Sequence, residues 1–280
     1  MRQYLEIVRN VLDNGSWKPN RTGIRTKSVS GAMFQHNMSD GFPLLTTKFV
    51  PFRLVASELE FFIKGLNDKR WLQERGNHIW DEWCDPRIVP YGNDPETKRR
   101  MMEEPKLGEI YGRQWRDFDG AGIDQLANIV RTLKTTPGDR RMLCVAWNPK
   151  QLNAQALPPC HYAFQVLVSG ENLDTLDLLW NQRSVDVALG LPFNIASYGL
   201  LLHLLAMEAG LKPGKLVGFL ADVHIYENHI EGLELQLTRK PLELPTLTIE
   251  NFTSIFDWEY TQAKISGYKH HGKISFEIAV

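Results

Sequence analysis

The sequence predicts an α+β fold built on one large β-sheet packed with helices. Residues 1–14 and 52–64 place apolar side chains at helical spacing, whereas residues 26–38 alternate in the manner of strands with one buried face. Strand-like runs follow at 142–147, 161–169 and 173–180. This mixture of elements favours a sheet covered by helices.

In the first half, the helix over residues 1–14 is expected to stop at Asn14-Gly15, and the helix over 52–64 is expected to close at Gly65. Residues 85–106 are rich in proline, glycine and alternating charge. We interpret them as a small surface excursion with a short helix, and not as a second domain.

In the second half, Gln125–Leu133 is expected to form an amphipathic helix, and a long helix is predicted from about Pro192 to Glu208, ended by Gly210. A strand at 216–221, a helix at about 225–238 and a tail of strands and loops over 243–280 complete the prediction. We expect one domain spanning residues 1–280.

Composition excludes several classes of function. The net charge of −1 gives no general electrostatic reason to bind nucleic acid or an anionic membrane. The apolar run Leu200–Leu202 is far shorter than a membrane span. The three cysteines show neither a paired framework nor metal-ligand spacing, and no leader is recognised at the amino end. We therefore expect a cytoplasmic protein without a metal.

Cys160 is the candidate nucleophile. A lone cysteine is more often an inert core residue, but two prolines fix the backbone before Cys160 and a strand is predicted after it. To react near neutral pH, the thiol needs a neighbouring cation that lowers its pKa, and Arg183 is the obvious candidate. Cys84 and Cys144 are interpreted as inert.

Four arginines beside small or turn residues are candidate phosphate ligands, because a guanidinium offers paired donors and stays charged. Any one of them alone is more often a solvated surface charge. Arg183 lies between two apolar runs, where an anionic partner would offset the cost of an unpaired charge. The four are Arg21, Arg140, Arg141 and Arg183.

Three further polar residues are candidates. Asn194, otherwise an ordinary capping residue, can accept from a pyrimidine N3–H while it donates to O4. Glu58, on or beside an apolar helix stripe, is expected to be partly buried and to exchange a proton near pH 7, whereas Glu60 and Glu82 are expected to be exposed. Asp186 is either a solvated carboxylate or a ligand for an N–H group.

A cysteine hydrolase is the competing enzyme class. His161 is adjacent to Cys160, and neighbouring strand residues point to opposite faces, so the two are poorly placed as a nucleophile and its base. His203 or His224 can serve only by folding nearby, which the sequence does not show.

Taken together, the motifs resemble the thymidylate synthase family over nearly the whole chain, and so many ordered matches are strongly specific. The matching stretches are Arg21-Thr22-Gly23, Gly41 through Lys48, Ile79 through Trp83, Ile110 through Trp115, Asp139-Arg140-Arg141, Leu157 through His161, Gln182 through Val187, Gly190 through Tyr198, and Asp222 through Tyr226.

The resemblance implies addition of Cys160 to C6 of dUMP and transfer of the methylene group of 5,10-methylenetetrahydrofolate to C5. It implies that Glu58 and Asn194 manage the protons at O4 and that Tyr111 lies near the C5 proton. The implied nucleotide ligands are Arg21, Arg183 and Ser184 at the phosphate, His224 and Tyr226 at the ribose, and Asn194 at the base, with Gln182 as a further substrate ligand. The implied folate ligands are Trp80, Asp186, Gly190, Phe193, Lys48 and Val280.

The resemblance also implies a homodimer joined through one face of the sheet, in which Arg140 and Arg141 reach the site of the other subunit. Uracil is the expected base, because cytosine-acting relatives carry an aspartate where Asn194 falls. Metal and nucleic acid are not expected as partners.

Two departures from the family pattern leave the final step open. Glu60 interrupts the usual run after Glu58, and Leu220-Ala221 replaces a Gly-Gly pair. A dUMP hydroxymethylase, in which water and not hydride quenches the intermediate, is the alternative, while Trp80, Tyr111 and the Ala279-Val280 ending favour hydride transfer. A non-catalytic dimer of the same fold is a remote alternative, since Cys160 and Arg183 are both retained.

Overall fold

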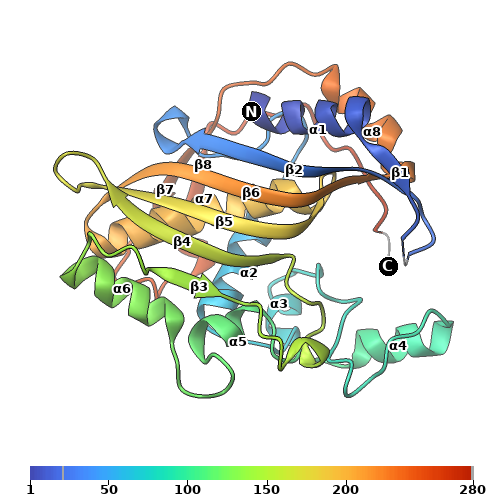
Figure 1. Cartoon of the computed structure of the whole chain (residues 1–280), viewed down its shortest axis with the longest axis horizontal. Helices are drawn as coiled ribbons and strands as arrows, with labels where there is room; N and C mark the ends of the chain where they lie inside the picture. Colours follow the sequence, from blue (N-terminus) through green and yellow to red (C-terminus); the bar gives the residue numbers. More distant parts are fainter. Residues whose placement is uncertain (21, 279–280) are drawn as a thin grey trace.

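The computed structural model describes residues 1–20 and 22–278, and it contains a six-stranded mixed sheet (Figure 1). The strand order is β1-β2-β6-β5-β4-β3, and β5 and β6 are parallel while the other neighbours are antiparallel. The strands are β1 Ser16–Lys18, β2 Thr26–Asn37, β3 Leu143–Val145, β4 His161–Ser169, β5 Thr175–Asp186 and β6 Lys212–Tyr226. The predicted α+β fold with a large mixed sheet is confirmed.

Helices cover one face of this sheet. Figure 1 shows α2 (Phe52–Ile63) and α7 (Gly190–Ala209) behind it, while α1 (Arg2–Asn14) packs along β2. A separate two-stranded sheet joins β7 (Thr246–Ile249) to β8 (Ala263–Ser266). The remaining helices are α3 Arg70–Gln73, α4 Pro95–Glu103, α5 Tyr111–Arg116, α6 Gln125–Thr135 and α8 Ile230–Leu237, with 3₁₀ turns at Met38–Asp40, Leu152–Ala154, Glu227–His229 and Tyr260–Gln262.

Helix α7 is the central core helix. It is longer than predicted, and its 20 residues are long and apolar enough to cross a membrane by composition alone, with a mean hydropathy of 1.4 over its most apolar window. Of that window, 67% is buried inside the protein, between the sheet and α2. Gly210, at φ +69°, ends the helix as predicted.

Strands β5 and β6 extend beyond their predicted ends, and the helix expected from residue 225 begins only at Ile230. The residues at these strand ends are polar and lack the side chains typical of strands, so the sequence did not predict them as strands. They extend the strands because the parallel pairing of β5 with β6 supplies hydrogen-bond partners for their backbone groups. Its register places Ser184 opposite Asp222 and Asp186 opposite His224. Two motifs about forty residues apart in sequence therefore lie side by side at one end of the sheet.

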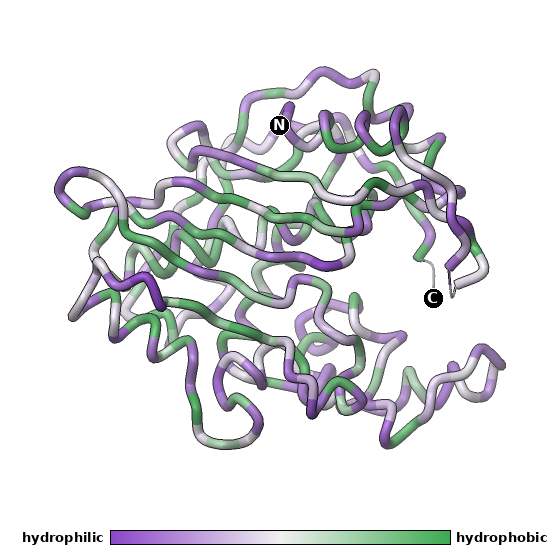
Figure 2. Tube along the Cα trace, in the orientation of Figure 1, coloured by the Kyte–Doolittle hydropathy of each residue, from purple (hydrophilic) through white to green (hydrophobic). Residues whose placement is uncertain are grey.

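The 85–106 segment contains the predicted short helix, α4, which Asp94 caps through the Thr97 N–H. Figure 2 shows this helix as predominantly hydrophilic. The buried Nζ of Lys69 donates to the carbonyls of Asp81, Trp83 and Met101, at 2.8–2.9 Å. One ammonium group therefore fastens α4 and the loop that carries Trp83 to the start of α3.

Candidate active site

A cavity of about 470 Å³ opens at the end of the sheet where β5 and β6 carry their polar residues. It brings together five predicted site residues, namely Cys160, Arg183, Ser184, His224 and Tyr226. Eight further lining residues had not been singled out: Lys18, Asn20, Thr22, Thr26, Trp147, Leu157, Pro158 and Asp222. Of these, Asn20, Thr22, Leu157, Pro158 and Asp222 belong to or flank motifs already recognised, which was the available signal.

Arg183 is fixed beside Cys160 by the chain that precedes the cysteine. Its guanidinium donates to the carbonyls of Pro158 and Pro159 at 2.7 and 2.9 Å, and it lies 5.3 Å from the centre of the Trp147 ring. Its backbone N–H donates to the Cys160 carbonyl at 2.8 Å. The cavity therefore holds a permanent positive charge next to a thiol, which favours the thiolate.

Tyr111, at the start of α5, contacts the cysteine directly. Its hydroxyl oxygen accepts the Cys160 N–H at 2.9 Å, and its ring stacks on His161 at 4.3 Å. Burial raises the pKa of Tyr111, so the phenol stays protonated.

His161 is a poor general base for Cys160. Its Nδ1 is hydrogen-bonded to the Tyr198 hydroxyl at 2.9 Å, and burial lowers the pKa of His161 to about 3. Burial also lowers the pKa of His203 to about 4, and that ring lies beside Phe42. His161 and His203 are therefore poorly suited to act as the base of a cysteine hydrolase, whereas His224 lines the same cavity as Cys160.

Glu58 lies on α2, partly buried, and its Oε1 accepts the Trp80 Nε1–H at 2.8 Å. Desolvation raises the pKa of Glu58 to about 7, while the bond from Trp80 opposes the shift. Trp80 meets the edge of the Tyr111 ring at 6.3 Å between centroids. A continuous set of contacts thus connects a proton-exchanging carboxyl to the cysteine backbone.

Asn194, in the second turn of α7, is held by Gln182 of β5. The Gln182 Nε2 donates to Asn194 Oδ1 at 3.0 Å. Nearby, Asp186 Oδ1 accepts the N–H groups of Ala188 and Leu189 at 2.9 and 3.0 Å. The end of β5 therefore fixes both the base-reading candidate and the start of the helix that carries it.

A family model described as thymidylate synthase matches residues 2–280. The chain belongs to the thymidylate synthase family. This membership confirms the resemblance seen in the sequence, and it identifies the chain as an enzyme of a C1-transferase family that uses dUMP-type and folate substrates.

Two of the predicted phosphate ligands lie away from the Cys160 cavity in this chain. Arg140 and Arg141 are exposed and line a separate depression with Thr136, Gly138 and Asp139. Arg141 pairs with Asp139 at 2.8 Å. Within one chain, therefore, they do not join the Cys160 cavity.

Four of the predicted folate ligands lie at or beside the start of α7, namely Lys48, Asp186, Gly190 and Phe193. Lys48 is buried, donates to the Ala188 carbonyl and faces the Phe276 ring, and burial lowers the pKa of Lys48 to about 8. Gly190 and Phe193 are partly exposed. Two predicted ligands, Arg21 and Val280, lie outside the described residues.

The expectation that Glu60 is exposed was wrong. Only 2% of Glu60 is accessible, because α2 is covered on most sides and not on one stripe. Its Oε2 accepts the Tyr260 N–H at 2.7 Å, and its Oε1 pairs with Lys64 at 2.7 Å. Both carboxylate oxygens are therefore engaged in structural bonds.

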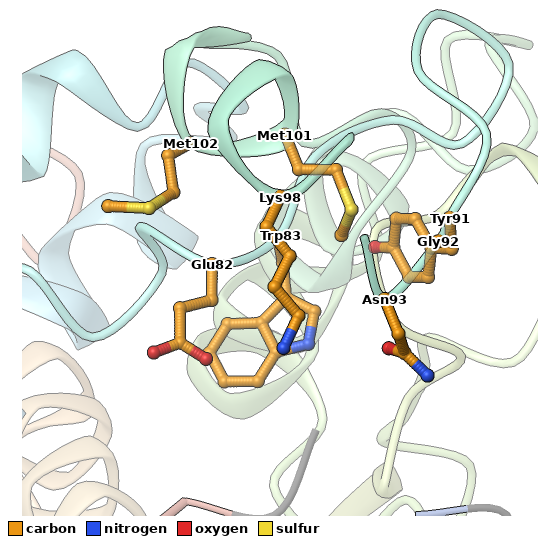
Figure 3. Close-up of a pocket in the computed structure, with 8 residues that line it drawn as sticks. All are labelled: Glu82, Trp83, Tyr91, Gly92, Asn93, Lys98, Met101 and Met102. Carbon is orange, nitrogen blue, oxygen red and sulfur yellow. The ribbon is translucent and has the colours of Figure 1, made fainter. Parts of the chain in front are cut away.

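A second cavity, of about 330 Å³, lies between the Trp83 loop and α4 (Figure 3). Figure 3 shows the indole of Trp83 and the carboxylate of Glu82 side by side at its wall, opposite the two methionines of α4. No sequence signal had marked this cavity. Among residues 1–20 and 22–278, no group of three His, Cys, Asp or Glu side chains is arranged to hold a metal ion.

Proposed function

We propose that this chain converts dUMP to dTMP, with 5,10-methylenetetrahydrofolate as the donor of both carbon and hydride. The observation that carries the proposal is the cavity in which Cys160 faces the same space as Arg183, Ser184, His224 and Tyr226. A thiol beside a fixed cation suits attack on a ring, and the neighbouring hydroxyl and imidazole groups suit a ribose phosphate.

In the proposed first step, the Cys160 thiolate adds to C6 of the uracil ring. Negative charge then moves to O4, where the Nδ2 amide of Asn194 donates a hydrogen bond and Glu58, acting with ordered water, supplies a proton. A carboxyl with a pKa of about 7 suits this task, because it both gives and takes a proton near neutral pH.

The ring carbon C5 then bonds to the methylene carbon of the folate as one of the two carbon–nitrogen bonds of that carbon opens. C5 loses its proton near the Tyr111 hydroxyl, and the second carbon–nitrogen bond breaks, which releases tetrahydrofolate and leaves an exocyclic methylene group on the ring. Expulsion of Cys160 breaks the C6–S bond. Hydride from the folate completes the methyl group, which gives dTMP and dihydrofolate. Tyr111 is suited to orienting the base that takes the C5 proton, since its own phenol stays neutral.

The residues present fit a folate. Asp186 uses Oδ1 within the chain, and no bond to its Oδ2 is recorded among the described residues, so this oxygen suits a pterin N–H group. The aromatic groups of Trp80 and Phe193 suit its rings, and Gly190 lies beside Asp186 and Asn194. We place Lys48 and Val280 in the same site, on the family pattern alone.

The burial of Glu60 favours hydride transfer over the hydroxymethylase alternative. Glu60 was one of the two departures that raised that alternative, but both its carboxylate oxygens are bonded inside the protein. A carboxylate held in this way is not available to activate a water molecule at the intermediate.

We further propose a homodimer formed through the face of the sheet opposite α2 and α7. Met33 and Phe219 are paired across β2 and β6 on that face, and 56% and 44% of their areas are exposed. Leu143 of β3 is exposed as well. A partner would cover this apolar surface and would carry Arg140 and Arg141 to the other site. With its three free cysteines, the enzyme is assigned to the cytoplasm.

The test is incubation of the protein with dUMP and methylenetetrahydrofolate, followed by mass analysis of the nucleotide and absorbance of the folate. Formation of dTMP together with dihydrofolate is expected. Formation of 5-hydroxymethyl-dUMP with tetrahydrofolate would replace the proposal by its alternative, and no nucleotide product would refute both.

A further inference from the structure

Trp180 of β5 is a core tryptophan with a single polar contact, and that contact leads to the candidate base-reading residue. Its side chain is fully buried, stacked on Tyr198 at 5.4 Å and tilted against Phe34 at 5.8 Å. Its Nε1–H donates to Gln182 Oε1 at 3.1 Å. Gln182, only 2% exposed, then donates to Asn194.

The indole fixes which way the Gln182 amide points. An indole nitrogen only donates, so the atom facing it must be the Gln182 oxygen. The amide nitrogen then faces the other way, where it donates to the Ser184 carbonyl and to Asn194 Oδ1, each at 3.0 Å. Turning this amide around would place nitrogen against the indole N–H and oxygen against a carbonyl.

The direction of Gln182 in turn fixes Asn194. Because Gln182 presents an N–H, Asn194 must present Oδ1 to it, and the Asn194 Nδ2 has no recorded acceptor in the described part of the chain. An amide in this orientation accepts from N3–H and donates to O4, which is the pattern of uracil. Cytosine, with an acceptor at N3 and a donor at C4, needs the opposite orientation.

We propose that Trp180 is a specificity-determining positioning residue, which rejects cytosine by locking the polarity of the Gln182 and Asn194 amides. The inference rests on the proposed function, in which Asn194 reads the base. In the wild type, accepting cytosine requires both amides to turn, which breaks the buried bond from Trp180. Without the indole N–H, that part of the penalty disappears.

The test compares binding of dUMP and dCMP by calorimetry, which needs no folate and no turnover. Trp180→Phe keeps an aromatic ring but removes the donor. The ratio of dUMP affinity to dCMP affinity is expected to fall about five- to tenfold, the factor that one buried hydrogen bond contributes. An unchanged ratio in a folded Trp180→Phe protein would overturn the inference.

Phe34→Leu is the matched control, because it loosens the packing around Trp180 and leaves the indole N–H in place. A purely structural role for Trp180 predicts that both variants lose thermal stability and that neither changes the affinity ratio. The inference predicts a changed ratio in Trp180→Phe alone.

Gln182→Glu tests the same relay from its other end, and it decides the matter if Trp180→Phe does not fold. A carboxyl at this position can accept from Asn194 Nδ2, so the preference is expected to move toward dCMP by about tenfold or more. No movement would refute the relay. Failure of wild-type protein to bind dUMP would instead refute the proposed function.

Discussion

The carboxylate of Glu58 accepts the indole N–H of Trp80 at 2.8 Å, and desolvation by burial raises the pKa of Glu58 to about 7. The hydrogen bond favours the charged form and burial disfavours it, and burial prevails. The carboxyl is thus poised to gain or lose a proton near neutral pH.

Glu58→Gln is expected to lower kcat about 10²- to 10⁴-fold, because it removes a group that transfers protons. The limb of the wild-type pH–rate profile near pH 7 should vanish in the variant. Initial rates between pH 5.5 and 9 measure both effects. Retention of that limb would assign it to another group.

The same substitution should stabilise the folded protein at alkaline pH. A raised carboxyl pKa means that the folded state holds the proton more tightly than the unfolded chain, so stability is lost as pH rises from about 4.5 to about 7. Glu58→Gln should escape this loss, with a gain of about 1–3 kcal/mol at pH 8 and little at pH 4.5. Urea unfolding at both pH values measures it, and equal differences at the two would contradict the assignment.

Cys160→Ala is expected to reduce turnover by about 10³-fold or more while dUMP remains bound, since the phosphate and ribose contacts stay in place. Calorimetry and initial rates separate the two outcomes. Cys144→Ala provides the control, because burial raises the pKa of Cys144 and the residue lies in the core. Substantial turnover by Cys160→Ala would exclude the proposed nucleophile.

Mixing two inactive variants tests the proposed crossing of Arg140 and Arg141. Cys160→Ser supplies intact arginines, and the Arg140→Ala, Arg141→Ala double variant supplies an intact cysteine. If each site takes its arginines from the partner, the mixed dimers have one complete site, and statistical exchange should restore about a quarter of wild-type activity. Activity that stays at the level of the separate variants would place the arginines in their own subunit's site.

Lys69→Met should destabilise the protein by about 2–4 kcal/mol, because three buried carbonyls lose a charged donor. Lys98→Met, which removes the same charge from an exposed position on α4, should change stability by less than about 0.5 kcal/mol. Urea midpoints of the two variants provide the comparison. Similar midpoints would show that the Lys69 bonds contribute little.

The sequence predicted the elements that carry a clear apolar period, such as α1, α2 and α6. It missed the ends of β5 and β6, because Gln182, Arg183 and Ser184 lack the side chains typical of strands and are held there by pairing between distant segments. It also led to the wrong expectation that Glu60 is exposed. The expectation assumed that α2 has one exposed polar face, whereas this helix is covered on most sides.

In the candidate site, likewise, some features were predictable from the sequence and others were not. Cys160 and Arg183 were recognisable from local context, and the structure places both at one cavity. The contacts that orient them, from Tyr111 to the Cys160 N–H and from Trp180 through Gln182 to Asn194, join segments far apart in the chain or use residues with an ordinary core appearance. Periodicity and motifs carry no information on such contacts.

The pairing of Trp180 with Gly218 on the neighbouring strand limits how this site can evolve. A Cβ atom at position 218 would lie 2.4 Å from the Trp180 ring. Gly218 can therefore be replaced only after Trp180 has been replaced by a smaller residue. If Trp180 sets the nucleobase preference as proposed, substitutions that change this preference can begin at Trp180, whereas a side chain introduced first at Gly218 would overlap the intact indole and destabilise the fold.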